Sequence, residues 1–201
     1  NETQWHYRFN INGMHDVQIN AMLRILCPVF PNIFCKQIPL YDSHGFPQLR
    51  KFIESDAIVA VCAWGTAKGP HSHERLMLKR KSMERNYLEI YDPWMQGTRK
   101  HNYGFKLIQK FLRRYFSNWT MRKIDRPAEQ AKGEGSCVAI SLTRAITVAE
   151  SGQLNDVTGR IPEWIPVLIK MLAVKFNTRK KANLFMFNQL SDTNSFTKEF
   201  G

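Results

Sequence analysis

The stretch GEGSCVAISLTRAITVAESG, residues 133–152, decides how this sequence is interpreted. Its apolar residues recur at helical spacing after a glycine-rich start, and Ser151 and Gly152 end the pattern. We therefore expect a helix that begins at or just before Cys137. Main-chain N–H groups at the start of a helix favour a thiolate and can face a developing oxyanion. This position makes Cys137 a candidate nucleophile.

Elements on both sides of this helix follow an order of strands first and helices later. The patterns predict helices over 16–26 and 104–116, one or two more helices in the C-terminal region, strands at 33–40, 58–64, 76–78, 88–91 and 119–124, and loops at 79–86 and 126–136. Such an order is typical of an α+β fold with a mixed sheet flanked by helices. No repeat or long linker divides the chain, so we expect a single catalytic domain over residues 1–201. Because the chain starts at Asn1 without Met, we expect a secretion or targeting segment to be missing.

Composition excludes some classes of protein and leaves the partner open. The chain is 43% apolar and 23% charged, which excludes a disordered protein and a collagen-like repeat. Its longest apolar stretch, residues 58–64, is far shorter than the roughly 20 residues that cross a bilayer. The net charge of +12 favours an anionic partner. Nucleic acid, an acidic membrane, a phosphorylated small molecule or the pyrophosphate of a coenzyme would each satisfy that preference.

The other cysteines carry no recognisable site. No CxxC pair is present, which argues against a zinc or dithiol centre. Cys27, Cys35 and Cys62 have apolar neighbours in the sequence, so we expect all three to be reduced and buried as small apolar side chains.

A histidine and an aspartate stand where they could activate Cys137. His71 and His73 open one predicted strand, and the next predicted strand ends at Asp92. Adjacent antiparallel strands bring such ends together, so the Asp92 carboxylate is expected to orient the His73 imidazole. Taken singly, each residue has an ordinary alternative: a turn aspartate, a partly exposed histidine and a packed cysteine. Their joint order favours a catalytic triad of His73, Asp92 and Cys137.

That order of histidine, acid and cysteine resembles the clan CE cysteine enzymes, which have the adenain/SUMO-protease type of α+β fold. Closer segment matches resemble the YopJ-family effector acetyltransferases. The matching segments are 30–38 (a Phe-Pro segment before the first core strand), 88–93 (an apolar strand running into an acid and Pro), 137–142 (the helix of the catalytic cysteine) and 174–181 (a lysine segment with trailing basic residues). Together they cover roughly residues 14–190.

The resemblance implies both a reaction and its ligands. It implies an enzyme, an acyltransferase that moves an acetyl group from acetyl-CoA through Cys137 to a Ser, Thr or Lys of a host protein. It also implies inositol hexakisphosphate as an anionic activator, Lys175 as the position acetylated in the family, and no requirement for nucleic acid. Residues implied or proposed to contact these cofactors are Lys132, Ser136, Lys175, Arg179, Lys180 and Lys181. A protein of this family is secreted and acts inside the host cell, in the cytoplasm or nucleus.

Four positions depart from the family pattern. Phe176 and Asn177 replace the family's His and Thr in the lysine segment, and Glu74 follows His73 where an aromatic residue is usual. Gln130 lies seven residues before Cys137, whereas related peptidases place their oxyanion glutamine six residues before the cysteine. The spacing therefore does not assign Gln130 a role.

Two other functions stay open. One is a peptidase with the same triad that cleaves ubiquitin or a ubiquitin-like modifier. The other is a non-enzymatic basic module for nucleic acid or acidic lipid. The basic runs available to such a module are 79–81, 113–114 and 179–181.

Overall fold

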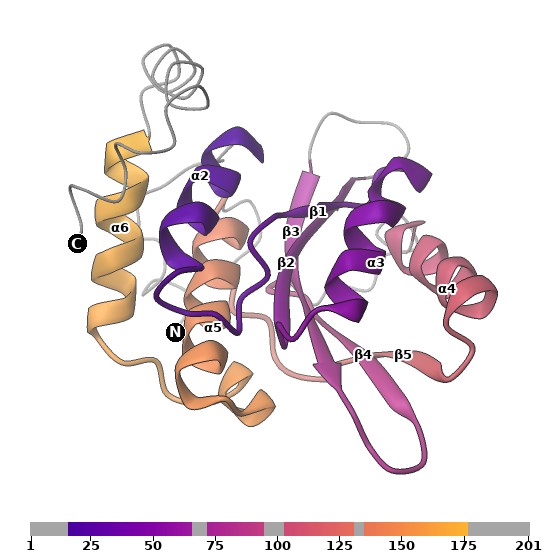
Figure 1. Cartoon of the computed structure of the whole chain (residues 1–201). Helices are drawn as coiled ribbons and strands as arrows, with labels where there is room; N and C mark the ends of the chain where they lie inside the picture. Colours follow the sequence, from indigo (N-terminus) through magenta and orange to yellow (C-terminus); the bar gives the residue numbers. More distant parts are fainter. Residues whose placement is uncertain (1–15, 66–71, 95–102, 131–134, 177–201) are drawn as a thin grey trace.

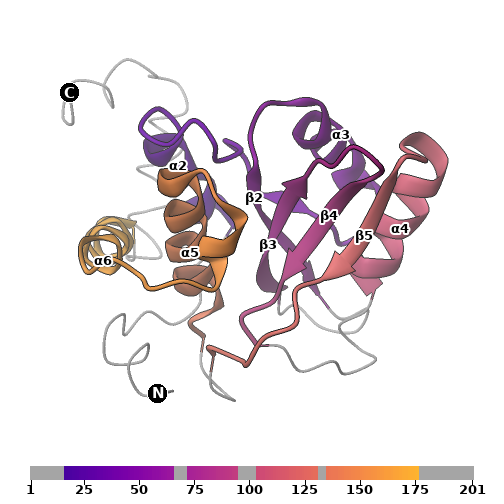
Figure 2. The same ribbon diagram turned by 90° about the horizontal axis from the view of Figure 1, so that it is seen from below.

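A central sheet between two layers of helices forms the body of the protein (Figures 1 and 2). The computed structural model describes residues 16–65, 72–94, 103–130 and 135–176. The elements in chain order are α2 (Asp16–Leu26), β1 (Ile38–Pro39), the 3-10 helix η1 (Ser43–Gly45), α3 (Phe46–Glu54), β2 (Val59–Gly65), β3 (Ser72–Arg80), β4 (Asn86–Tyr91), α4 (Tyr103–Tyr115), β5 (Trp119–Lys123), α5 (Cys137–Ser151), the 3-10 helix η3 (Leu154–Val157) and α6 (Trp164–Phe176). Helices α3 and α4 cover one face of the sheet, and α2, α5 and α6 lie on the other (Figure 2). None of the described helices is long and apolar enough to cross a membrane.

The sheet is mixed, as the sequence predicts. Its five strands lie in the order β1-β2-β3-β4-β5. The outer pairs β1–β2 and β4–β5 are parallel, and the inner pairs β2–β3 and β3–β4 are antiparallel. In this register His73 pairs with Trp64 of β2, and Leu76 pairs with Tyr91 of β4. The start of β3 and the end of β4 therefore lie at the same edge of the sheet.

Helix α5 is the central helix of one of two hydrophobic cores. Every residue from Cys137 to Ala149 is buried, which is the pattern of a helix surrounded on all sides. Its core includes Ile19 of α2, Leu76 of β3 and Ile169 of α6. Gly152 ends the helix with a φ of 68°, a left-handed conformation that glycine adopts without strain. The predicted helix that starts at Cys137 and stops at Ser151–Gly152 is confirmed.

Three elements differ from the prediction. The predicted strand 33–40 is reduced to β1, with Ile33 making only an isolated bridge to Val59. Strand β3 extends to Arg80, through residues predicted to be a loop, because Lys79 pairs with Leu88 of β4. Helix α3 was not predicted; only three of its residues are buried. The ammonium group of Lys79 donates hydrogen bonds to carbonyl oxygens at the end of α3.

The prediction that all three remaining cysteines are buried is confirmed for Cys62 alone. Cys62 is buried and Cys27 half-buried, but Cys35 is exposed. Cys35 follows the Ile33 bridge, and its neighbour Phe34 takes the inward position in the core beside α3. All four cysteines are free thiols. The Cys27 thiol faces the Ile33 carbonyl oxygen at 3.4 Å and also contacts the thiol of Cys35.

Candidate active site

His73 and Asp92 meet at the edge where β3 begins and β4 ends. The imidazole Nε2 lies 2.6 Å from the carboxylate Oδ1. Burial lowers the pKa of His73 below its ordinary value, and the bond to Asp92 only partly opposes that effect. The imidazole is therefore neutral at physiological pH. The contact expected from the spacing is present, while a catalytic role for the pair stays a prediction.

Asp92 is held by more than the histidine. Its second oxygen, Oδ2, accepts a hydrogen bond of 2.8 Å from Nε of Arg75, and the main-chain N–H of Trp94 donates to Oδ1 at 2.9 Å. Burial alone would raise the pKa of Asp92, but the bond to His73 and the charge of Arg75 hold that pKa well below its usual range. The Trp94 ring meets the His73 ring edge-on, with centroids 5.9 Å apart. Asp92 is thus an ionised, fixed acceptor.

Arg75 belongs to the site although the sequence analysis did not select it. It is 1% exposed, and its Nη1 donates to the carbonyl oxygens of His73 and Trp64 at 2.9 and 3.2 Å. Its guanidinium carbon also lies 4.0 Å from the Trp64 ring centroid. The available signal was strand alternation, which puts residues 73 and 75 on the same face.

Cys137 is the first residue of α5, and the residue is 9% exposed. Its sulfur faces the main-chain N–H groups of Val138 and of Glu74, the residue next to His73. These groups favour a thiolate, but burial outweighs them and raises the pKa of the thiol to about 11. The structure therefore brings Cys137 to the beginning of β3 as a neutral thiol.

A cluster of buried polar groups lies on the α2 side of β3. Glu74 is 1% exposed, and its Oε1 accepts a hydrogen bond of 2.5 Å from Nε2 of Gln37. The same amide nitrogen donates to Oδ1 of Asp16 at 3.1 Å. Sequence reasoning noted Glu74 only as a departure from the family pattern. Glu74 lies on the face of β3 that also carries Leu76 and Leu78, which pack in the core around α5. An acid among these apolar positions was the signal in the sequence for a special role.

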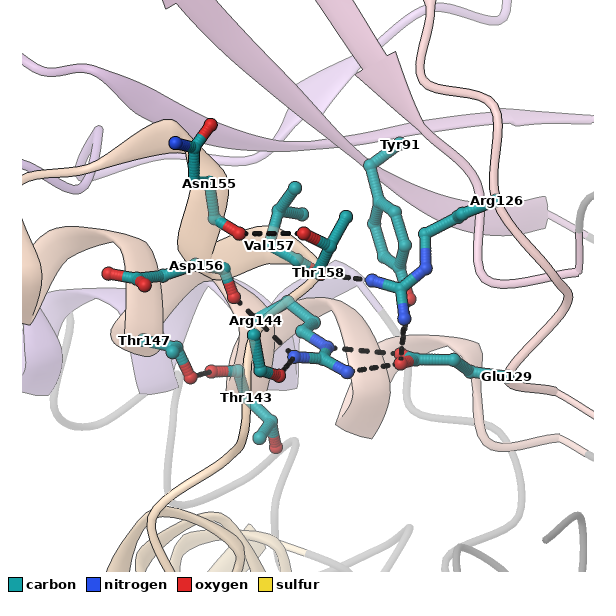
Figure 3. Close-up of polar contacts among 11 residues, drawn as sticks. Tyr91, Arg126, Glu129, Thr143, Arg144, Thr147, Asn155, Asp156, Val157 and Thr158 are labelled. Carbon is teal, nitrogen blue, oxygen red and sulfur yellow. Dashed lines mark hydrogen bonds and ion pairs between the residues drawn. The ribbon is translucent and has the colours of Figure 1, made fainter.

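The loop before Cys137 is anchored by a buried carboxylate (Figure 3). Oxygens of Glu129 accept hydrogen bonds from Arg126 at 2.5 Å, from Arg144 of α5, and from the Tyr91 hydroxyl at 2.5 Å. The main-chain N–H groups of residues 129 and 130 both donate to the carbonyl oxygen of the residue after Asp92, at 2.8 and 2.9 Å. Gln130, which is 8% exposed, therefore lies beside the acid end of the site.

The residues predicted to contact cofactors are only partly described. Ser136 is buried at the N-cap of α5, and Lys175 is exposed in the last turn of α6. The remaining predicted contacts, and also His71, lie outside the described residues; these contacts are Lys132, Arg179, Lys180 and Lys181. Most of the glycine-rich turn before Cys137 is outside them as well.

Comparison with known proteins identifies the fold. No family model matches the sequence, and no curated protein matches it either. The ASFV pS273R protease superposes with a TM-score of 0.51 at 10% identity, over 82% of this chain and 68% of that chain. The fold is that of the clan CE cysteine enzymes, as expected.

Two further structures are similar at lower scores. The SUMO protease Ulp1 with its catalytic cysteine oxidised to a sulfenic acid has a TM-score of 0.48 at 12% identity, over 84% of this chain and 82% of that chain. HopZ1a in complex with IP6 and CoA has a TM-score of 0.45 at 16% identity, over 81% of this chain and 54% of that chain.

Proposed function

We propose that this protein is an acyltransferase that carries an acetyl group on Cys137. The observation that supports this most is the His73–Asp92 contact of 2.6 Å, with the Cys137 sulfur against the main-chain N–H of Glu74, the residue that follows His73 in the sequence. A neutral imidazole accepts a proton, and a cysteine at a helix start is a nucleophile once it loses one.

The first half-reaction follows from the resting protonation states. Because the Cys137 thiol and the His73 imidazole are both neutral, the proton passes from sulfur to His73 as the sulfur attacks the acetyl carbonyl. Asp92 stabilises the imidazolium that forms. The bond from the acetyl carbon to the coenzyme sulfur then breaks, and His73 returns its proton to that leaving thiolate.

The second half-reaction uses the same base. A hydroxyl or amine of the acceptor protein attacks the acetyl-cysteine, and His73 takes its proton. The bond to Cys137 breaks, and the cysteine leaves as a thiolate that recovers the proton. One base serving both steps implies ping-pong kinetics, and loss of His73 stops both steps.

The proposal also includes the acetyl donor, the acceptor, the activator and the place where the protein acts. We take acetyl-CoA as donor, a host protein as acceptor, and inositol hexakisphosphate as activator, with the protein secreted and acting inside the host cell. Only one cation of the predicted phosphate contacts, Lys175, is described, and one cation does not make a site for a hexakisphosphate. No step of the mechanism is therefore assigned to the activator.

The deciding experiment is the intact mass of the purified protein with acetyl-CoA, with and without inositol hexakisphosphate. We expect a gain of one acetyl group that the variant Cys137→Ala loses. Cys35→Ala is the matched control, because Cys35 is the exposed thiol and would take up acetyl groups non-specifically. No gain under either condition, or a gain that depends on Cys35, would refute the acetyltransferase.

A peptidase for ubiquitin or a ubiquitin-like modifier is the second candidate. It is favoured by Gln130, whose main-chain N–H is hydrogen-bonded to the carbonyl oxygen of the residue after Asp92. Gln130 therefore lies beside the site, although it is seven residues before Cys137 and not six. A ubiquitin or SUMO vinyl-sulfone probe tests it directly. Labelling of wild type but not of Cys137→Ala, without acetyl uptake, would establish the peptidase instead.

A further inference from the structure

Glu74 adjoins the candidate nucleophile: its main-chain N–H faces the Cys137 sulfur, and its carboxyl interacts electrostatically with that thiol. One oxygen accepts the Gln37 amide, and no hydrogen-bond donor among the described residues reaches the other oxygen, Oε2. The side chain is 1% exposed, so water does not replace the missing donor in the way it would at a surface. Burial in that position therefore costs an ionised carboxylate much more than a neutral carboxylic acid.

We propose that Glu74 is a positioning acid of the site: a proton retained on its carboxyl allows Cys137 to become a thiolate, and loss of that proton holds Cys137 as a neutral thiol. This rests on the proposed role of Cys137 as nucleophile. The reason is that both groups are buried at the junction of β3 and α5, where two negative charges repel strongly.

The charged groups around Glu74 also favour its neutral form. Asp16 on α2 shares the Gln37 amide with it and adds a second negative charge. Burial and Asp16 raise the pKa of Glu74 well above its ordinary value, against the hydrogen bond from Gln37 and the positive charge of Arg75. The charge of Glu74 in turn raises the pKa of Cys137 and that of the buried thiol Cys62 on β2.

The consequence is an order in which protons leave. When the Cys137 proton passes to His73, Glu74 keeps its own proton, and the site carries one negative charge on sulfur. If Glu74 has already lost its proton to solvent, the same transfer would leave two adjacent anions. The acid therefore limits the pH range over which the thiolate forms.

The test measures the thiol itself and needs no acetyl donor. Alkylation of Cys137 by iodoacetamide is followed peptide by peptide by mass spectrometry, from about pH 6 to about pH 10, in the wild type and in Glu74→Gln. We expect equal rates at the acid end and, as rising pH takes the proton from wild-type Glu74, a rate that becomes at least about threefold higher in the variant. Asp16→Asn should move the step in the wild-type profile to lower pH, because it removes the charge that disfavours ionisation of Glu74.

Two controls separate this role from a structural one. Glu89→Gln removes another buried carboxyl of the same sheet, and its rate ratio to wild type should not change with pH. In a thermal melt, Glu74→Gln should have a higher melting temperature than wild type at neutral pH and the same melting temperature near pH 4. At neutral pH the unfolded wild-type chain has an ionised Glu74 that must take up a proton on folding, which costs free energy, whereas near pH 4 this group is largely protonated before folding.

A rate ratio of Glu74→Gln to wild type that is constant over the whole range would overturn the proposal. The proposal would also be overturned if Asp16→Asn did not change the pH at which the step in the alkylation profile occurs. These outcomes concern the thiol alone, so they are distinct from failure of the acetyl-uptake experiment, which would refute the acetyltransferase and leave the role of Glu74 standing.

Discussion

Asp92 uses its two oxygens for two different partners, and this division sets the properties of the site at the scale of single residues. Oδ1 meets His73, and Oδ2 meets Arg75. The carboxylate therefore cannot rotate to follow one partner without losing the other. Such a fixed acceptor orients the imidazole before any substrate binds, which is how preorganised sites avoid reorganisation during the reaction.

Asp92→Asn should lower the rate of acetyl transfer by about 10²- to 10⁴-fold, because an amide does not stabilise the imidazolium. The measurement is single-turnover acetylation of Cys137 followed by mass. Asp42→Asn is a suitable control, since it changes an exposed carboxylate that contacts an exposed histidine, His44, in the same way that Asp92 contacts His73. A rate within threefold of wild type would remove Asp92 from the mechanism.

Arg75→Met should move the acid limb of the pH–rate profile to higher pH. The positive charge of Arg75 lowers the pKa of His73, so removal of that charge raises the pKa. As the pH falls, the neutral imidazole that acts as base is then protonated at a higher pH than in the wild type. The profile is recorded for acetyl uptake, and the folded state is checked by its thermal melt. Arg113→Met, at an exposed position of α4, should leave the limb unchanged. A shift to lower pH in Arg75→Met contradicts the argument.

At the scale of elements, α3 depends on one side chain from the sheet. Nζ of Lys79 donates to the carbonyl oxygens of Phe52 at 2.9 Å and Ile53 at 3.3 Å, and also to that of Ser55. The Phe52 oxygen also accepts from the main-chain N–H and the hydroxyl of Ser55, so Lys79 adds a further donor at a helix end, where a cation is also favoured by the helix dipole. Burial lowers the pKa of Lys79 to about 8.

Lys79→Met should lower the free energy of unfolding by about 1–3 kcal/mol, because the carbonyl oxygens of Ile53 and Ser55 lose the donor that Lys79 supplies. Urea unfolding at neutral pH measures the change. The matched control is Lys110→Met on the exposed side of α4, which should stay within about 0.5 kcal/mol of wild type. Equal stability of the two variants would show that water replaces the ammonium.

Periodicity was enough to predict α2, α4 and α5, because each has an apolar stripe or run between clear stop signals. It failed for α3, whose end is stabilised by Lys79, a residue 24 to 27 positions away in sequence and beyond any local window. The same limit applies to the site. The order of His73, Asp92 and Cys137 is visible along the chain, but the contact between Gln37 and Glu74 depends on the parallel pairing of β1 with β2.

At the scale of the whole molecule, Glu129 joins parts that are distant in sequence. Its carboxylate meets Tyr91 from β4, Arg126 from its own loop and Arg144 from α5 (Figure 3). Arg126 and Arg144 also donate to carbonyl oxygens in and after η3. The loop that leads to Cys137 is thus fastened to both the sheet and the central helix.

Glu129→Gln should destabilise the fold by about 3 kcal/mol, because the buried Arg144 and the partly buried Arg126 would lose their counter-charge. Chemical unfolding gives the change. Glu54→Gln breaks an exposed ion pair with Arg50 and should cost less than about 1 kcal/mol. If both variants lose the same small amount, the buried charges are solvated better than the contacts imply.

Alternation along β3 sends consecutive side chains to opposite layers of the protein. His73 turns to Asp92 and Arg75, while Glu74 turns to Gln37 and Asp16 of the other layer. A slip of β3 by one residue would exchange the two, so that an acid would face Asp92 and a base would enter the carboxyl cluster. Insertions and deletions within β3 are therefore excluded by the chemistry as well as by the packing. Any length variation among natural or engineered versions of this protein should be confined to the connections on either side of this strand.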